Sequence, residues 1–201
     1  MLNILGIDPG STVTGFGLIR TDGVRHRCLA HRHLRLAAYP FNERLGRIHQ
    51  QLGELLLEWQ PDEVAIEQVF VSNNAMAALK LGQARGAAIA CAVAAGFPVA
   101  EYTPRSVKQA VTGSGAADKQ QVQVMIRHLL HLREPVQADA ADGLAIALCH
   151  AQTRNWNGGL QQAVDAAEAA GASSAGAAAT SRRGKARRNV RWTAAALPRT
   201  R

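Results

Sequence analysis

The sequence predicts an α/β domain followed by a basic tail, and three features support this. Short apolar segments rich in β-branched residues alternate with segments whose apolar residues recur at helical spacing. The opening segments are typical of an antiparallel meander, whereas each later strand follows a helix. The chain has 201 residues, enough to bury one sizeable core. We therefore expect a folded domain over residues 1–155 and a disordered tail over 156–201.

The first predicted strand, residues 2–8, ends in a carboxylate, Asp8. The Pro-Gly pair that follows turns the chain sharply, so Asp8 lies at the end of a strand. Residues 13–21 alternate like a second strand, and residues 21–23 form a turn into a third. The chain therefore begins as a meander with an acidic residue at its edge.

The next helix and strand repeat this arrangement of an acid at a strand end. Apolar residues recur at helical spacing between Pro40 and Pro61, which predicts an amphipathic helix. The strand predicted over residues 63–67 then ends in Glu67. We expect Asp8 and Glu67 to lie at adjacent strand ends.

A long helix is predicted from an asparagine cap, Asn73 or Asn74, toward Gly96. Small residues recur at every fourth position along most of it and form a stripe. They are Ala78, Gly82, Gly86, Ala90 and Ala94. A stripe of this kind permits close approach, either to the sheet or to a second copy of the chain.

The remaining elements are a short strand and three helices. The strand is predicted over residues 97–102, and Pro104 begins a brief helix. Asp118 caps the next helix, and the last helix begins at about residue 138. The Gly/Ser-rich residues 112–115 form a loop between the first two of these helices.

Four acids are candidates for one site: Asp8, Glu67, Asp139 and Asp142. Asp139 and Asp142 are three residues apart, so they share a face of the last helix. Each acid alone has an ordinary explanation, such as a turn, an ion pair or a favourable helix dipole. Together they would repel one another unless a cation were bound. Carboxylates suit Mg²⁺ or Mn²⁺, and two such ions about 3.5 to 4 Å apart can clamp a phosphodiester while water attacks it.

The basic charge of the chain is concentrated in the tail. Residues 151–201 hold nine of the 23 Lys and Arg residues but only two of the 15 acids. The tail is Ala/Gly/Ser-rich and then Arg-rich, and it has few large apolar side chains to offset the entropy of ordering. It could serve as an electrostatic arm for a polyanion or simply as a solubilising extension.

The composition argues against secretion and against a membrane protein. Cys28, Cys91 and Cys149 are odd in number and widely spaced, which favours reduced thiols over disulfides or a zinc site. The first residues carry no basic segment before their short apolar run, so we expect no signal peptide. No apolar stretch is long enough to cross a bilayer. A cytoplasmic location is the simplest expectation.

Four spaced motifs resemble the RuvC family of Holliday junction resolvases. They are residues 5–11 with Gly15 and Gly17, residues 66–70 with Asn74, residues 78–86, and residues 139–142. The resemblance runs over about residues 1–155 and implies a ribonuclease-H-like fold with a mixed five-stranded sheet flanked by helices. It also implies a homodimeric, Mg²⁺-dependent endonuclease that acts with RuvA and RuvB on four-way DNA junctions in recombination and repair.

The resemblance assigns a role to each matching position. Asp8, Glu67, Asp139 and Asp142 would be catalytic and would bind metal, with two Mg²⁺ per site and Mn²⁺ able to substitute. Attack of a metal-activated water would leave a 5′-phosphate and a 3′-hydroxyl. The opposed strands of the junction would be nicked in pairs.

Other positions matched by the resemblance are linked to DNA binding. Lys108 and Lys119 would contact DNA phosphates, and Phe70 would stack on bases at the opened centre of the junction. Gly143 departs from the family, which usually has Ala there, and should weaken its helix by up to about 1 kcal/mol. The tail also exceeds what family members usually carry.

Two alternative functions are also compatible with the sequence. The acids alone fit a ribonuclease-H-like nuclease of another specificity equally well. Residues 6–12 also match the phosphate-gripping loop of actin-like ATPases and sugar kinases. Those proteins need two comparable halves around the nucleotide, and neither a second half nor a second loop is evident in the sequence.

Overall fold

The predicted mixed sheet is present and contains five strands in the order β3-β2-β1-β4-β5. The strands are β1 (Leu2–Asp8), β2 (Val13–Thr21), β3 (His26–Arg35), β4 (Glu63–Glu67) and β5 (Val99–Tyr102). This computed structural model describes residues 1–69 and 74–154, so Phe70 and the tail predicted over 156–201 lie outside the described residues.

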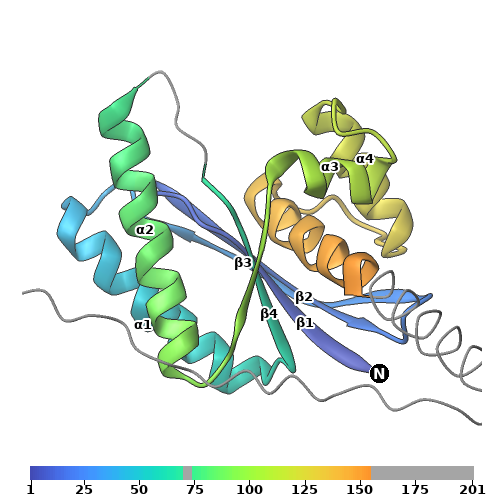
Figure 1. Cartoon of the computed structure of the whole chain (residues 1–201), viewed down its shortest axis with the longest axis horizontal. Coiled ribbons are helices and arrows are strands. Elements are labelled where there is room, and N and C mark those ends of the chain that lie inside the picture. The colour runs from blue at the N-terminus through green and yellow to red at the C-terminus, as the bar shows by residue number, and fades with distance from the viewer. Residues whose placement is uncertain (70–73, 155–201) are drawn as a thin grey trace, which may run out of the picture. The chain divides into compact units, whose positions relative to one another are not determined.

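Helices cover both faces of the sheet (Figure 1). They are α1 (Phe41–Trp59), α2 (Ala75–Ala94), α3 (Pro104–Thr112), α4 (Lys119–Leu129) and a helix that begins at residue 138 and runs to the last described residue, 154. The first two pack on one face and form one hydrophobic cluster with it, and the other three form a second cluster on the opposite face. Among the described residues, no helix has the length and hydropathy needed to span a membrane.

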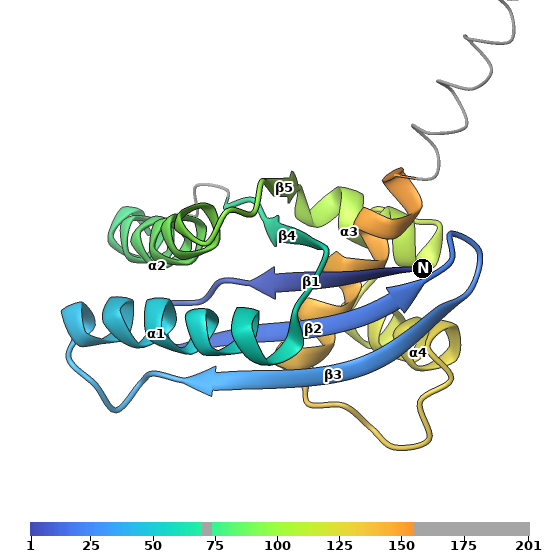
Figure 2. The same cartoon turned by 90° about the horizontal axis from the view of Figure 1, so that it is seen from below.

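The register of β1 places the two strand-end acids side by side. β1 runs antiparallel to β2, where Asp8 pairs with Gly15, and parallel to β4, where Ile7 pairs with Ile66. Asp8 follows Ile7 and Glu67 follows Ile66, so the two acids lie next to each other at the carboxyl ends of two adjacent parallel strands. Figure 2 shows this order of strands across the sheet.

Three predicted helix starts are confirmed by their caps. The Asn74 side chain accepts a hydrogen bond from the Ala77 backbone N–H at 3.0 Å and begins α2. Thr103 caps α3, with Pro104 in its first turn. Asp118 forms a reciprocal capping box with Gln121 at the start of α4. These residues satisfy backbone N–H groups that have no partner within a helix.

The small-residue stripe of α2 does not face the sheet, so that alternative is wrong. The buried residues of α2 are Ala84, Ala88, Cys91 and Ala92. Gly82 and Gly86 are exposed, and a β-carbon added at either position would have open space around it. The stripe therefore lies on the outer surface of this protomer.

Gly143 also has a packing role that the sequence did not predict. A β-carbon at Gly143 would lie 2.7 Å from the backbone nitrogen of Gly17 and 2.8 Å from the carbonyl carbon of Phe16. A β-carbon at Gly6 would in turn overlap the carbonyl oxygen of Gly143. In this chain the 138–154 helix therefore packs directly against the backbone of β1 and β2 at Gly143, where a β-carbon would force the two apart.

Candidate active site

A cavity of about 270 Å³ lies at the carboxyl ends of β1 and β4. The carboxylates of Asp8, Glu67 and Asp142 line it, together with Lys108 from α3 and Lys119 from α4. The structure thus brings three of the four predicted acids and both predicted lysines around one cavity. These residues come from five different elements, which explains why no single segment of sequence reveals the site.

Close backbone packing positions the fourth acid, Asp139. A β-carbon at Gly15 would overlap the carbonyl oxygen of Asp139, so the start of the 138–154 helix rests directly on β2. Gly15 is the β2 partner of Asp8. Asp139 is therefore beside Asp8 although it is not among the residues that line the cavity, and its negative charge contributes to raising the pKa of Asp8.

The two strand-end acids are hard to ionise when no cation is bound. Burial raises the pKa of Asp8 to about 7, and repulsion from Asp142 and Asp139 adds to the effect. Burial also raises the pKa of Glu67 to about 7, with further repulsion from Asp8 and Asp142. A bound cation would reverse this balance because it favours the ionised carboxylates.

Lys119 provides positive charge within this acidic cluster. Its Nζ donates a hydrogen bond to Asp142 Oδ2 at 2.9 Å. This bond raises the pKa of Lys119, so the side chain is held as a cation. Lys119 also lowers the pKa of Asp8 and Glu67 relative to what burial alone would give, and Lys108 does the same for Glu67.

The donor set fits a hard divalent cation, although the carboxylates are not closed around one. Oxygen ligands at half-buried, mutually repelling carboxylates are the chemistry that Mg²⁺ and Mn²⁺ prefer. Within residues 1–69 and 74–154, no three acidic, histidine or cysteine side chains are gathered closely enough to form a finished metal-binding group. Binding would therefore have to draw the acids closer together.

Arg85 of α2 fixes the end of β4, a contact that sequence reasoning missed. Its Nε donates to the backbone carbonyl of Glu67 at 3.3 Å, and its guanidinium forms an ion pair with Glu101 of β5. The Arg85 side chain is only 22% exposed. The sequence signal for this contact is an arginine on the packed side of an Ala-rich helix. A long cationic side chain is seldom buried there without a partner.

A second polar network joins β4 and β5 to the 138–154 helix away from the acids. Tyr102 Oη and His150 Nδ1 are 2.7 Å apart, and His150 Nε2 lies 2.8 Å from Glu63 Oε2. Arg154 Nε donates to the other Glu63 oxygen at 2.9 Å. These contacts agree with a structural role for His150.

Comparisons with known proteins agree with this geometry. A family model described as "Crossover junction endodeoxyribonuclease RuvC" matches residues 4–150. RuvC of Halorhodospira halophila is 56% identical over 156 residues, covering 77% of this chain and 93% of the relative. RuvC of Tolumonas auensis is 52% identical over 154 residues, covering 77% and 89%.

A solved structure agrees as well. The structure described as "T. thermophilus RuvC in complex with Holliday junction substrate" superposes with a TM-score of 0.74 at 38% identity, covering 78% of this chain and 97% of that one. The fold is therefore the ribonuclease-H-like fold that the motifs implied. The chain belongs to the RuvC family of crossover junction endodeoxyribonucleases.

Proposed function

We propose that this protein is a Holliday junction resolvase that nicks opposed strands of a four-way DNA junction in pairs. The observation that carries the proposal is the pair of acids at adjacent parallel strand ends, in a cavity shared with Asp142 and two lysines. An acidic site of this kind suits hydrolysis of a phosphodiester. Family membership supplies the junction as the substrate.

Nucleases of this family are metal-dependent, and in this chain Asp8, Glu67, Asp139 and Asp142 would hold the metal. Mg²⁺ is our choice of ion, with two per site, and Mn²⁺ would be able to replace it. When bound, the metal supplies activation of water and stabilisation of the departing 3′ oxygen. The cut would leave a 5′-phosphate and a 3′-hydroxyl.

The residues around the acids would hold and orient the DNA. Lys108 and Lys119 are cations that line the same cavity, and they would pair with phosphate oxygens next to the cut. In the free protein Lys119 is bound to Asp142, so it would exchange this partner for a phosphate when the site fills. Phe70 follows Glu67 by three residues and would stack on an unpaired base.

A homodimer would supply two matched sites for the two opposed strands. The outer face of α2 is our candidate for the interface. It carries the exposed Gly82 and Gly86, flanked by large exposed apolar side chains: Met76, Leu79 and Val93. Small residues in the centre would let two helices approach closely, and the apolar residues would bury surface.

RuvA and RuvB, which move the branch point, are the partners that we propose. The setting would be homologous recombination and DNA repair in the bacterial cytoplasm, where the chromosome is located. Copurification of the three proteins on a synthetic junction would test this assembly. If the three proteins did not copurify under conditions in which the junction is cut, that result would argue against a stable complex.

Cleavage of an end-labelled synthetic four-way junction tests the activity. The substrates would be the junction, a matched duplex and an RNA:DNA hybrid, with Mg²⁺ or EDTA, and the proteins would be the parent and Asp8→Asn. We expect symmetric nicks in the junction that need Mg²⁺ and that Asp8→Asn abolishes while junction binding persists.

The other outcomes would overturn the proposal. Hybrid cleavage would identify a ribonuclease-H-like enzyme of another specificity. Binding without cleavage would identify a junction-recognition protein. If neither binding nor cleavage occurred, ATP hydrolysis by the pure protein would be measured next, because an actin-like phosphate binder would then be the better explanation.

A further inference from the structure

The second half of β3 carries three basic side chains on the face of the sheet that bears the acids. His31 pairs with Gly17, His33 pairs with Gly15 and Arg35 pairs with Val13 of β2. Residues directly opposite in an antiparallel pair share a face. Gly15 and Gly17 face the 138–154 helix, since their β-carbons would meet it. These three residues, the β3 basic strip, therefore lie on the same face as that helix.

The β3 basic strip is in register with the acidic site. Asp8 pairs with Gly15, and Gly15 pairs with His33, so the three residues form one row across β1, β2 and β3. Neighbouring strands are about 4.8 Å apart, which puts the backbone at His33 about 10 Å from that of Asp8. DNA whose scissile phosphate lies at Asp8 would be long enough to reach His33 as well.

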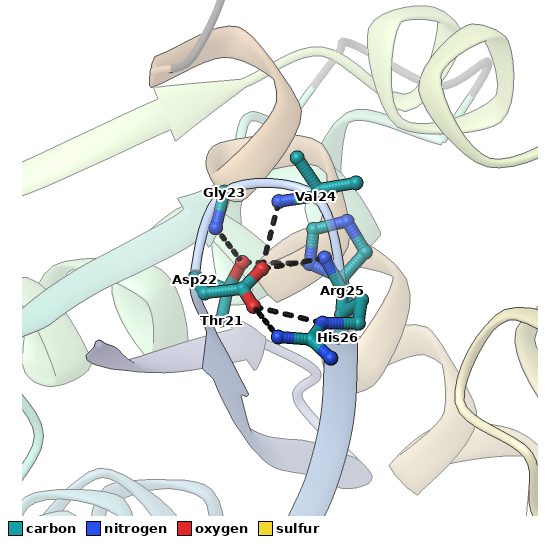
Figure 3. Close-up of polar contacts among 6 residues, drawn as sticks. All are labelled: Thr21, Asp22, Gly23, Val24, Arg25 and His26. Atoms are coloured by element: carbon teal, nitrogen blue, oxygen red, sulfur yellow. Dashed lines mark hydrogen bonds and ion pairs between the residues drawn. The ribbon is translucent and has the colours of Figure 1, made fainter.

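The hairpin turn that starts β3 is tightly bonded (Figure 3). Asp22 Oδ1 accepts hydrogen bonds from the backbone N–H groups of Val24 and Arg25 at 3.0 and 2.7 Å. Thr21 Oγ1 accepts one from the Gly23 N–H at 2.9 Å and lies 2.9 Å from His26 Nδ1. The turn thus fixes the pairing of the first residues of β3 with β2.

A register shift further along β3 then turns the basic side chains toward the acids. Ile19 pairs with Cys28 but Leu18 pairs with Ala30, so Leu29 is an extra residue. Without the shift, Arg32 would lie opposite Gly15, and the strip would point to the other face. A bulge of this kind re-aims side chains and is common next to active sites.

The strip has no polar partner in the described part of the chain. None of its three side chains makes a hydrogen bond or ion pair with residues 1–69 or 74–154. His31 and Arg35 are exposed, and His33 is partly exposed. Arg32, which points to the other face, does have partners: it pairs with Glu58 at 3.2 Å and lies over the Trp59 ring.

We infer that the β3 basic strip binds backbone phosphates of the DNA arm that enters the active site. The inference rests on the proposed function, and it adds a contact surface on β3 to the lysines of the cavity. Side chains two residues apart on a strand are about 7 Å apart, so the strip extends over about 14 Å of a polyanion. It would position the DNA without reading its sequence.

The salt dependence of junction binding tests the strip. The triple variant His31→Gln, His33→Gln, Arg35→Gln would be made in an Asp8→Asn background, so that binding is measured without cleavage. Each lost phosphate contact should reduce the slope of log affinity against log salt by about 1. We expect a slope lower by about 1 to 3 and an affinity at least about tenfold weaker at low salt.

A matched control lies on the same strand. Arg27 is exposed, pairs with Arg20 at the far end of β3 and lies before the register shift. Arg27→Gln should leave both slope and affinity unchanged. The single variant Arg35→Gln should lower the slope by about 1 and guards against misfolding of the triple variant.

The outcomes separate the two proposals. If the Asp8→Asn parent binds the junction and the folded triple variant binds it with the same slope and affinity, the strip does not contact DNA and this inference is wrong. If the parent itself binds no junction, the proposed function is wrong and the role of the strip fails with it. If Arg27→Gln and Arg35→Gln lowered junction affinity and salt slope equally, the effect would come from net charge alone. That result would also overturn the inference.

Discussion

Asp8 and Glu67 give the metal-free protein a defined pH dependence of stability. The pKa of Asp8 rises from 3.8 to about 7 on folding because of burial. Between these values the folded state retains a proton that the unfolded state has released, so stability falls as the pH rises through this window. At pH 8 the ionised Asp8 is destabilising, and Asp8→Asn should be more stable than the parent by roughly 2 to 4 kcal/mol.

Urea unfolding in EDTA at pH 5 and pH 8 would measure this effect. The control is Glu134→Gln, which removes an exposed acid outside the site and should change stability little at either pH. A loss of stability in Asp8→Asn at pH 8 would show that the carboxylate is well satisfied in the metal-free fold. That result would also weaken the argument that the site requires a cation.

Gly143 gives a second prediction at the scale of single residues. A methyl group there would meet backbone atoms of β2 at 2.7 and 2.8 Å, so Gly143→Ala should push the helix that carries Asp142 away from the sheet. We expect a loss of about 1 to 3 kcal/mol in unfolding free energy. Cleavage should fall as well, because Asp142 would move from the other acids.

The same substitution at Gly46 is the control. Gly46 is exposed within α1, and a β-carbon there would meet nothing within 4 Å. Gly46→Ala should therefore stabilise the protein by up to about 1 kcal/mol through helix propensity. Opposite signs in the two variants would support the packing role of Gly143, and a gain in both would refute it.

At the scale of elements, Arg85 connects α2 to the end of β4. Its bond to the backbone carbonyl of Glu67 and its ion pair with Glu101 hold the end of β4, so we expect Arg85 to act as a positioning residue for the Glu67 carboxylate. Arg85→Gln should lower the cleavage rate by about 10- to 100-fold, the usual effect of losing a group that orients a ligand. Junction affinity should stay the same, since Arg85 is not among the residues that line the cavity.

Mn²⁺ affinity, measured by calorimetry, separates positioning from general damage. It should fall in Arg85→Gln and recover partly in Arg85→Lys, which keeps the charge but not the forked donors. Lys80→Gln, an exposed position on the same helix, should match the parent. Unchanged Mn²⁺ affinity in Arg85→Gln would rule out the positioning role.

The elements that could be predicted from the sequence are those with local signals. Capping side chains, apolar periodicity and strands that end in acids depend on neighbouring residues, and they correctly located the strand ends and three helix starts. The packing of Gly143 was not predicted because it depends on contact with β2, which is distant in sequence. The register shift beside Leu29 was missed for the same reason, since a β-bulge is defined only by its partner strand.

The candidate site was predictable as a set of residues but not as an arrangement. Four acids in family motifs were predicted to share one site, and the order of the sheet places Asp8 beside Glu67. The Lys119–Asp142 bond and the contact between Arg85 and Glu67 depend on how the helices pack against the sheet. Such contacts follow from tertiary packing, which single-sequence patterns do not encode.

For the whole molecule, the exposed stripe of α2 predicts how two protomers would meet. Gly82→Leu would place a large side chain where two helices are expected to approach closely, so the dimer should dissociate at least about tenfold more readily. Sedimentation equilibrium would measure this change. Gly46→Leu, at an exposed glycine near the start of α1, is the control and should leave the oligomeric state unaltered.

The pattern of cuts links that interface to the reaction. A monomer still carries a complete set of acids, so Gly82→Leu should retain nicking of single junction strands at protein concentrations below the dissociation constant of its dimer. Coordinated cutting of two opposed strands should be lost, because paired nicks within one junction need two sites related by symmetry. A supercoiled cruciform plasmid reports the difference directly, since paired nicks linearise it and a single nick relaxes it. Linear product from a Gly82→Leu protein that remains a stable dimer would show that α2 is not the interface.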